Sequence, residues 1–337
     1  ELRKPFEIMG SMVHVGGSIG IAISPFQGSE RTELLRKADI AMYKAKDDGR
    51  NDYRFFTGKM DESIASRRVI EDDLRAALRS GGELFVEYQP KLDATGRRIS
   101  GLEALVRWQH PTRGKLAPDA FIPVAEECGL IDAVGGWVLA EACRVARKWP
   151  ELSMAVNISP VQFRTPDVAH SIRSIVLEAG VKPEQIELEV TESILVEDDD
   201  AVKAALEDLR ASGFRIALDD FGTGYSSLSY LKKFKVDRIK IDKSFVKRLG
   251  HDPEAIAIVQ AVIALGHAMA LSVTAEGVET EEQECLLQVA GCNELQGFLF
   301  SKALIEEDLQ SFFLGKHTPF DDTELVSKTR PQVRFGT

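Results

Sequence analysis

The sequence predicts an α/β protein: a (β/α)8 barrel of the TIM type with an antiparallel first strand, preceded by a partial α/β segment. Eight strand-like apolar segments alternate with helix-like stretches over about 250 residues. Most of these strands end on a carboxylate, an amide or a lysine, which indicates that they deliver polar groups to one common face. The first link, residues 91–99, is too short for a crossover helix and therefore predicts antiparallel pairing of the first two strands.

The first predicted unit covers residues 1–57. A strand-like stretch at 13–24 precedes a helix at 32–47 and a short strand near 53–56. The helix carries apolar residues at three- and four-residue spacing, a stripe that needs a packing partner. Because this unit is too small to bury a core alone, we expect it to be the rear part of a domain.

A charge-rich amphipathic helix at 58–80 is predicted to connect this unit to the barrel, which we place at 81–316. Barrel strands are expected at residues 84–91, 99–108, 153–158, 185–191, 214–219, 236–241, 270–276 and 294–300. Helices are expected at residues 137–149, 167–179, 199–212, 253–267 and 280–290. Residues 317–337 show little periodicity and are predicted to form a loose tail. In such a barrel the active site lies at the carboxyl ends of the strands.

Composition narrows the classes of function. The chain has 337 residues, 44% of them hydrophobic and 28% charged, as is typical of a soluble globular protein. Its net charge of -11 argues against binding to DNA or RNA polymers, because such binding needs clustered Lys and Arg. A phosphate-bearing substrate would need divalent metal to approach an acidic pocket.

The sequence also bears on location. No apolar run reaches the roughly 20 residues of a membrane-spanning helix, and residues 1–4 lack a signal-peptide core. The four cysteines include no CxxC pair, which disfavours a zinc finger and favours free thiols in a reducing compartment. We expect a cytoplasmic location and no membrane contact by this fragment, while an upstream sensory or membrane region in a longer protein stays open.

Two adjacent acids, Asp219 and Asp220, end one predicted strand and open a glycine-punctuated loop at 221–227. At a frayed strand end both carboxylates can turn toward one cavity. Two acids in that position can bridge a pair of divalent ions. The alternative is a solvated turn with capping acids.

A neighbouring strand carries Glu187 and Glu189 at a spacing of two, on one face of a segment predicted to be buried. A buried unpaired carboxylate is very unfavourable, so at least one of them should meet a cation. We assign that role to Glu189, nearer the strand end, and expect Glu187 to form an ion pair with a partner that the sequence does not name. Glu192 is placed to hydrogen-bond the loop that begins at Phe221.

Other strand ends add polar groups. Asn157 follows an apolar pair, although a capping or turn role is an alternative. Lys240 lies on the inward face of a predicted strand, where a lysine must pair with acids or with a water that is losing its proton. The last two strands are followed by two acids, an amide and an aromatic: Glu276, Glu279, Gln296 and Phe298.

Several short motifs follow one another in a fixed order between residues 63 and 316. They lie at residues 88–90 (Tyr-Gln-Pro), 103–108 (Glu-Ala-Leu-Val-Arg-Trp), 219–227, 240, 275–279 and 296–297. In this order they closely resemble the EAL-domain cyclic di-GMP phosphodiesterases. Residues 1–57 resemble the rear half of a GGDEF diguanylate cyclase domain, through residues 17–22, 38–46 and 49–51. The signature that names the cyclase family does not occur in this chain, so we expect no cyclase activity from it.

The resemblance implies hydrolysis of cyclic di-GMP to linear pGpG in bacterial second-messenger signalling, with two divalent cations, Mg2+ or Mn2+. It assigns the first ion to Glu103, Asn157, Glu189 and Asp219, and the second ion to Asp219, Asp220 and Glu276. Lys240 would orient or stabilise the nucleophilic water, and Glu276 is a candidate proton acceptor. Two such ions clamp a phosphodiester and lower the pKa of a bridging water.

The resemblance also implies substrate contacts. Arg107 fits as a phosphate fork, because guanidinium offers paired donors. Gln89, Glu279 and Gln296 are candidate polar contacts or supports. Phe298 stands where the family commonly has tyrosine, so a stacking face remains and a hydroxyl donor is lost. Ala303 replaces a frequent proline.

Two other functions stay open: a non-catalytic receptor for cyclic di-GMP with the EAL fold, and a scaffold that only dimerises. Such receptors typically lack a metal ligand or the lysine, and here every such position is filled, which favours catalysis. We expect a homodimer through the barrel, since the loop after Asp220 leads into a helix that in this family often packs against a partner.

Overall fold

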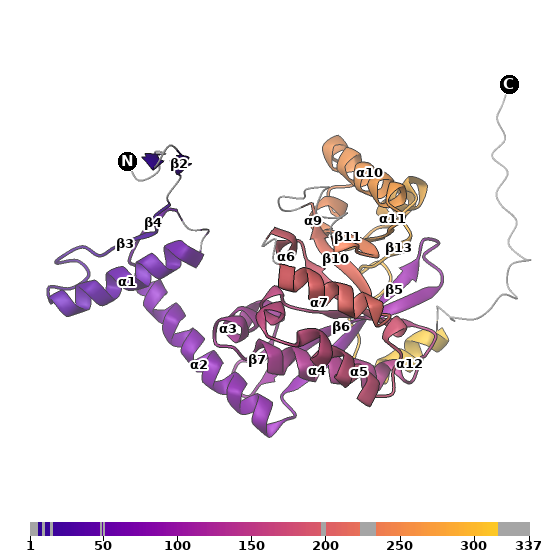
Figure 1. Cartoon of the computed structure of the whole chain (residues 1–337), viewed down its shortest axis with the longest axis horizontal. Coiled ribbons are helices and arrows are strands. Elements are labelled where there is room, and N and C mark those ends of the chain that lie inside the picture. The colour runs from indigo at the N-terminus through magenta and orange to yellow at the C-terminus, as the bar shows by residue number, and fades with distance from the viewer. Residues whose placement is uncertain are drawn as a thin grey trace, which may run out of the picture. The chain divides into compact units, whose positions relative to one another are not determined.

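The computed structural model describes residues 6–8, 11–13, 16–47, 49, 51–196, 200–222 and 234–315. The chain divides into two compact units, Glu1–Ala76 and Ala77–Thr337 (Figure 1). The division falls inside helix α2 (Gly58–Ser80), which covers the predicted connector. Within the described ranges, no helix combines the length and the apolar character needed to cross a lipid bilayer.

The first unit is a small α/β segment. Strands β1 (Phe6–Ile8) and β2 (Ser11–Val13) pair antiparallel, whereas β3 (Ile19–Ile21) and β4 (Tyr53–Phe55) pair parallel and are joined through helix α1 (Arg31–Asp47). A Cβ atom at Gly20 would lie 1.8 Å from the Ala38 carbonyl oxygen, so glycine lets α1 approach β3 closely. Among the described residues of this unit, Ile40, Ala41 and Phe56 form a buried cluster against which Ala22 and Met60 pack.

The strand predicted at residues 13–24 was too long. Among the described residues of that stretch, β3 covers only Ile19–Ile21. The apolar pattern continues to Ile23, but Ser24 and Pro25 belong to a turn. Proline lacks the backbone donor that a sheet ladder requires, which explains why the strand does not continue.

The second unit is a closed barrel of eight strands, which confirms the predicted TIM-type architecture. The strands are β5 (Leu84–Asp93), β6 (Ile99–His110), β8 (Ser153–Asn157), β9 (Ile186–Thr191), β10 (Arg215–Phe221), β11 (Arg238–Ile241), β12 (Ser272–Ala275) and β13 (Glu294–Leu295). From β6 to β13 the neighbours pair in parallel and in chain order. Strand β5 closes the barrel by pairing antiparallel with both β6 and β13. Strand β7 (Gly114–Leu116) extends β6 as a hairpin.

Helices surround the barrel in alternation with its strands (Figure 1). The longer ones are α4 (Ile131–Ala146), α5 (Val168–Glu178), α7 (Asp200–Ala211), α10 (Pro253–Ala268), α11 (Glu281–Ala290) and α12 (Glu306–Gly315). Short helices α3 (Ile122–Glu127), α6 (Ser193–Val196) and α9 (Lys243–Val246) follow β7, β9 and β11. On β9 the apolar residues Ile186, Leu188 and Val190 alternate with Glu187 and Glu189, so the strand sends its carboxylates to the barrel interior.

Two predicted boundaries were wrong for identifiable reasons, and one helix was missed. Helix α4 begins at Ile131 rather than at 137, because Gly135 and Gly136 resemble a break but lie inside the helix. A Cβ atom at Gly135 would lie 2.4 Å from the Gln162 side-chain nitrogen, so the glycine allows a close contact. The strand predicted at 294–300 ends at Leu295, after which the chain turns to hydrogen-bond with Val278. Helix α12 was not predicted at all.

The tail predicted at 317–337 lies outside the described residues, as do residues 223–227 of the loop after Asp220. The proposed domain boundaries remain predictions.

Candidate active site

Lys240 lies at the centre of a group of acidic side chains. Its ammonium nitrogen is 2.6 Å from Glu189 Oε2, 2.6 Å from Glu276 Oε1, 3.3 Å from Asp219 Oδ2 and 3.8 Å from Glu103 Oε2. We call these four acids the carboxylate ring. Strands β6, β9, β10 and β11 and the residue after β12 supply its members and the lysine. Glu103 comes from the first half of β6, and the others lie near or just after the carboxyl ends of their strands. The prediction that an inward-facing Lys240 pairs with acids is confirmed.

Amide side chains fix the orientation of Glu103. Asn157 Nδ2 donates to Glu103 Oε1 at 2.8 Å, and Gln296 Nε2 donates to Glu103 Oε2 at 2.6 Å. Gln296 Nε2 also lies 3.2 Å from Gln89 Oε1, and Gln89 donates to the Ser301 carbonyl at 3.2 Å. The structure thus gathers three of the predicted amide residues around one predicted metal ligand.

The carboxylate ring carries more negative charge than Lys240 can balance, since four acids face one ammonium. Burial opposes the charge on Lys240, but the surrounding carboxylates outweigh burial and raise its pKa well above the usual value. Burial, reinforced by Glu103, raises the pKa of Glu189 well above its usual range. Burial likewise raises the pKa of Glu276 to about 7. An additional positive charge would therefore stabilise the ring.

Glu103 behaves differently from its neighbours. Burial alone would raise its pKa, but Lys240 and the two amide donors more than compensate, so that its pKa lies below the usual value. The ring therefore contains at least one acid, Glu103, whose ionised form is favoured, while the other carboxylates interact with the same Lys240 ammonium.

Some buried oxygen atoms in this region accept no hydrogen bond. Among the described residues these atoms are Glu189 Oε1, Glu192 Oε1 and Gln296 Oε1. Buried acceptors normally have a partner, because an unsatisfied one is unfavourable. An oxygen of this kind is suited to coordinate a cation.

The arrangement is nevertheless not that of a ready-made metal cage. No group of three or more Asp, Glu, His or Cys residues in the described ranges has the geometry to hold a metal ion. The ring oxygens converge on the Lys240 ammonium instead. Coordination of a cation would require some of these carboxylates to turn away from the lysine.

The end of β10 presents the two adjacent acids. The pairing of β10 with β11 shifts between Leu218 and Phe221, and Asp220 has a positive φ of 55°. This irregularity allows Asp219 to face Lys240 while Asp220 is exposed. Partial desolvation of its carboxyl group and the neighbouring Asp219 raise the pKa of Asp220.

Glu192 lies next to the start of the loop that follows β10. Its Oε2 accepts a hydrogen bond from the Gly222 backbone at 3.3 Å, while Oε1 accepts none. Gly222 has a φ of 97°, which favours glycine, and a Cβ atom there would lie 3.1 Å from the Phe245 ring. The residues that follow, from 223 to 233, lie outside the described ranges.

Three residues predicted to contact the substrate interact with side chains outside the carboxylate ring. Arg107 Nε donates to Glu87 Oε2 at 2.9 Å. Glu279 pairs with Lys247 at 3.3 Å. Phe298 is 61% exposed, and the Lys302 ammonium lies 5.6 Å from its ring centre.

Beneath the ring lies a second set of charges, Lys91, Glu187, Arg238 and Glu294, which we call the inner ion cluster. The predicted ion pair of Glu187 is confirmed, whereas sequence reasoning missed its partners. The partners of Glu187 are Lys91 Nζ at 2.6 Å and Arg238 Nε at 2.8 Å. A usable signal existed, because Lys91 and Arg238 each lie two residues from a predicted site residue on the same strand. Side chains two apart on a strand share a face.

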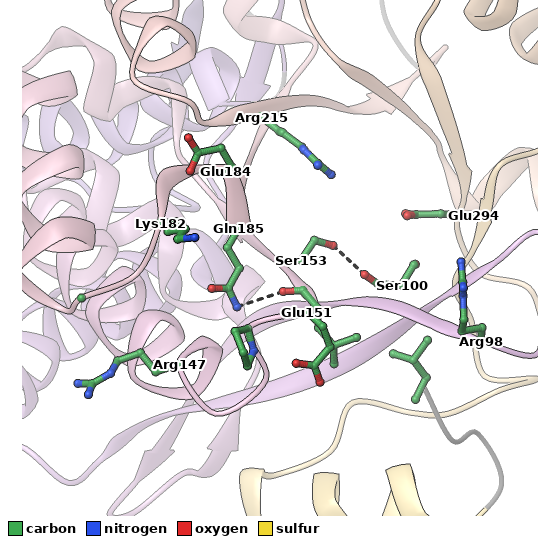
Figure 2. A pocket seen from close by; sticks show the side chains of 14 residues that line it. Arg98, Ser100, Arg147, Glu151, Ser153, Lys182, Glu184, Gln185, Arg215 and Glu294 are labelled. Atoms are coloured by element: carbon green, nitrogen blue, oxygen red, sulfur yellow. Dashed lines mark hydrogen bonds between the residues drawn. The ribbon is translucent and has the colours of Figure 1, made fainter. Parts of the chain in front are cut away.

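A cavity of about 760 Å3 lies at the other end of the barrel, where the strands begin. Residues at the starts of four strands line it, among them Ser153, Arg215 and Glu294 (Figure 2). Gln185 stabilises one wall by donating to the Leu152 carbonyl at 3.1 Å. No member of the carboxylate ring lines this cavity, so its size does not identify it as the place of the chemistry.

Comparison with protein families gave two matches. The profile described as "EAL domain" matches residues 71–303, and the profile described as "Diguanylate cyclase, GGDEF domain" matches residues 1–52. The "Bifunctional diguanylate cyclase/cyclic di-GMP phosphodiesterase MucR" of Pseudomonas aeruginosa is 44% identical over 313 residues, which cover 91% of this chain and 46% of that protein. The chain spans less than half the length of the curated relatives that it matches.

Solved structures share the barrel. The PaMucR phosphodiesterase in complex with c-di-GMP is similar with a TM-score of 0.69 and 45% identity, covering 72% of this chain and 99% of that chain. The Klebsiella pneumoniae protein BlrP1 in complex with calcium and c-di-GMP has a TM-score of 0.60 and 33% identity, covering 67% of this chain and 57% of that one.

Proposed function

This chain belongs to the EAL domain family, and from that premise we propose that it hydrolyses cyclic di-GMP to linear pGpG with two divalent cations, Mg2+ or Mn2+. The single observation that supports this proposal most is the carboxylate ring around the buried Lys240 at the carboxyl ends of the strands. We propose that this hydrolysis takes part in bacterial second-messenger signalling. The c-di-GMP complexes of PaMucR and BlrP1 support the choice of substrate.

The donor set fits divalent cations. Carboxylate and amide oxygens are the ligands that Mg2+ and Mn2+ prefer, and Glu189 Oε1 accepts no hydrogen bond that a cation would displace. We assign one ion to Glu103, Asn157, Glu189 and Asp219, and the other to Asp219, Asp220 and Glu276. When bound, two ions lower the pKa of a shared water and offset the charge of the phosphodiester.

The residues of the chain have separate roles in this reaction. Lys240, whose ammonium contacts Glu189 and Glu276, is proposed to orient the attacking water as a hydrogen-bond donor. Glu276, 2.6 Å from that ammonium, is proposed to accept the proton of the water. The water oxygen adds to phosphorus and the ribose 3′ oxygen leaves, so the product carries a 5′ phosphate.

Substrate contacts lie around the carboxylate ring. Arg107 donates through Nε to Glu87 and through Nη1 to the Val106 carbonyl, and it is proposed to bind a phosphate through Nη2. Phe298 offers an exposed ring on which a guanine base can stack. Gln89, Glu279 and Gln296 are proposed as polar contacts or supports. Glu192 is proposed to anchor the loop after β10 through Gly222.

We further propose the domain organisation 1–57, 58–80, 81–316 and 317–337, in which β3, α1 and β4 are the rear part of a GGDEF domain. A homodimer through the barrel and a cytoplasmic location are also proposed. Both rest on the family resemblance rather than on the geometry of the chain.

The proposal is tested by incubating the purified chain with cyclic di-GMP and Mn2+ and separating the nucleotides by chromatography. We expect conversion to pGpG, and loss of conversion in Lys240→Met. Lys182→Met, which removes an exposed lysine far from the ring, is the matched control and should convert normally. Binding of cyclic di-GMP by the wild type without any product would contradict hydrolysis and favour a receptor instead.

A further inference from the structure

The barrel interior contains two layers of charged side chains. On β9, Glu187 and Glu189 are two residues apart, and on β11 the same holds for Arg238 and Lys240. All four are buried. Since such pairs point to the same side of a strand, Glu187 and Arg238 form a layer beneath the carboxylate ring.

Lys91 is the member of the inner ion cluster that reaches toward the ring. It extends from β5 and has an exposed fraction of 0%. Its ammonium nitrogen is 2.6 Å from Glu187 Oε1 and 3.8 Å from Glu189 Oε1. The nearer carboxylate therefore fixes the lysine, and the lysine in turn faces the oxygen of Glu189 that accepts no hydrogen bond.

Arg238 makes the lower contacts of the cluster. Arg238 pairs with Glu187 at 2.8 Å and with Glu294 at 2.6 Å, and it donates to Thr274 Oγ1 at 2.8 Å. Glu187 is consequently held by two cations, Lys91 and Arg238. Their interactions with its carboxylate outweigh the effect of burial and lower the pKa of Glu187 to about 2. The inner ion cluster as a whole is electrically balanced, with two cations and two carboxylates.

The space for Lys91 depends on a neighbouring glycine. A Cβ atom at Gly101 on β6 would lie 3.3 Å from Lys91 Cε and 2.1 Å from Ser153 Oγ. Gly101 is two residues before Glu103 and so shares its inward face. The missing side chain leaves room for the lysine to extend across the barrel interior.

We propose that Lys91 is a positioning residue for Glu189, holding that carboxylate from beneath and thereby setting the affinity of the ring for divalent cations. This inference rests on the proposed function. Glu189 lies between two ammonium groups, because Lys240 contacts Oε2 at 2.6 Å while Lys91 faces Oε1. Loss of Lys91 would leave Glu189 held through Oε2 alone by Lys240, so that Oε1 would lose the group that positions it. Residues that orient metal ligands typically change metal affinity about 10- to 100-fold when they are removed.

The test is Mn2+ titration by calorimetry on the full chain, comparing the wild type with Lys91→Met. We expect Mn2+ affinity to fall between about 10- and 100-fold, with kcat at saturating Mn2+ changed much less than affinity. Lys182→Met changes the net charge equally from an exposed site and should bind Mn2+ as the wild type does.

A double variant, Lys91→Met with Glu187→Gln, separates positioning from a purely structural role. It removes both members of the 2.6 Å ion pair, so the inner ion cluster stays balanced even if Lys91→Met alone fails to fold. We expect the melting temperature to recover relative to Lys91→Met while Mn2+ affinity stays low. Recovery of Mn2+ affinity together with stability, or wild-type affinity in folded Lys91→Met, would overturn the inference.

A failure of the role proposed for Lys91 can be distinguished from a failure of the proposed function. If the wild type converts cyclic di-GMP and Lys91→Met binds Mn2+ normally, only the positioning role fails. If the wild type makes no pGpG, the proposed reaction fails, and the calorimetric comparison still reports whether Lys91 acts on the ring.

Discussion

At the scale of single residues, the charge on Lys240 holds the candidate site together. One buried ammonium contacts two carboxylates at 2.6 Å and lies within 3.8 Å of two more. All four acids in the ring thus share Lys240 as a source of positive charge, and Glu189 also faces Lys91. Substitutions in the ring should consequently affect chemistry more than folding when divalent cations are present, since bound cations replace the missing positive charge.

Lys240→Ala and Glu103→Ala should each abolish turnover, because one removes the donor that orients water and the other removes a proposed metal ligand. We expect initial rates of pGpG formation to fall by at least about 100-fold. Circular dichroism in Mn2+ should show a retained fold. A variant with wild-type hydrolysis would refute the role assigned to its residue.

Glu192→Ala should weaken metal binding indirectly. The Glu192 carboxylate accepts from the Gly222 backbone at 3.3 Å, close to Asp219 and Asp220, so its loss should loosen the end of β10. Calorimetry should show Mn2+ affinity reduced about 10-fold. Glu184→Ala, which removes an exposed acid at the other end of the barrel, serves as the control. Unchanged metal affinity and unchanged activity would make Glu192 a structural acid only.

At the scale of elements, α12 is held against α4 by charged and aromatic contacts. Glu306 pairs with Arg144 and Lys148 on the α4 side. Farther along α12, the Phe313 ring lies 5.1 Å from the Trp149 ring. These contacts position the last helix of the barrel, which was not predicted from the sequence.

Glu306→Gln should reduce stability mainly above pH 4. Hydrogen bonds from Arg144 and Lys148 outweigh burial and lower the pKa of Glu306 to about 2, below its usual value of about 4.3. Its ionised form therefore stabilises the fold above about pH 4.5, and that contribution disappears as the pH falls toward 2. Urea unfolding should show a difference of about 0.5–1 kcal/mol at pH 7, vanishing near pH 2. A difference independent of pH would contradict this explanation.

The strand ends show what the sequence could and could not predict. Alternation along β9 identified Glu187 and Glu189 as inward-facing, and the structure places both in the interior. The spacing of Lys91 from Gln89 indicates that the lysine faces inward, but its pairing with Glu187 could not be predicted, because the two residues are 96 positions apart and meet only when the barrel closes. The same holds for Arg107, whose partner Glu87 is brought near by the antiparallel pairing of β5 and β6.

At the scale of the whole molecule, the barrel carries the candidate site without residues from the first unit. Every member of the carboxylate ring belongs to the unit Ala77–Thr337. Removal of residues 1–57 should therefore leave a folded barrel with Mn2+ affinity and kcat within about twofold of the full chain. Loss of Mn2+ binding in a folded, truncated chain would contradict the proposed domain organisation.

Periodicity predicted the barrel because eight strands and their helices repeat a simple local pattern. Periodicity did not predict local exceptions to this pattern. Examples are the two glycines inside α4 and the short strand β13, which ends where the chain turns toward Val278. These exceptions depend on close contacts with distant segments. A single sequence does not reveal such contacts, whereas it does reveal the residue types at strand ends.

The most direct measurement is anomalous diffraction from crystals of the chain grown with Mn2+ and cyclic di-GMP. The account predicts two manganese peaks at the carboxyl ends of the strands, each within about 2.2 Å of oxygens from the carboxylate ring. Glu103 and Glu189 should contact one peak and Glu276 the other. Absence of manganese from the ring, with Lys240 still holding all four acids while cyclic di-GMP is bound, would contradict it.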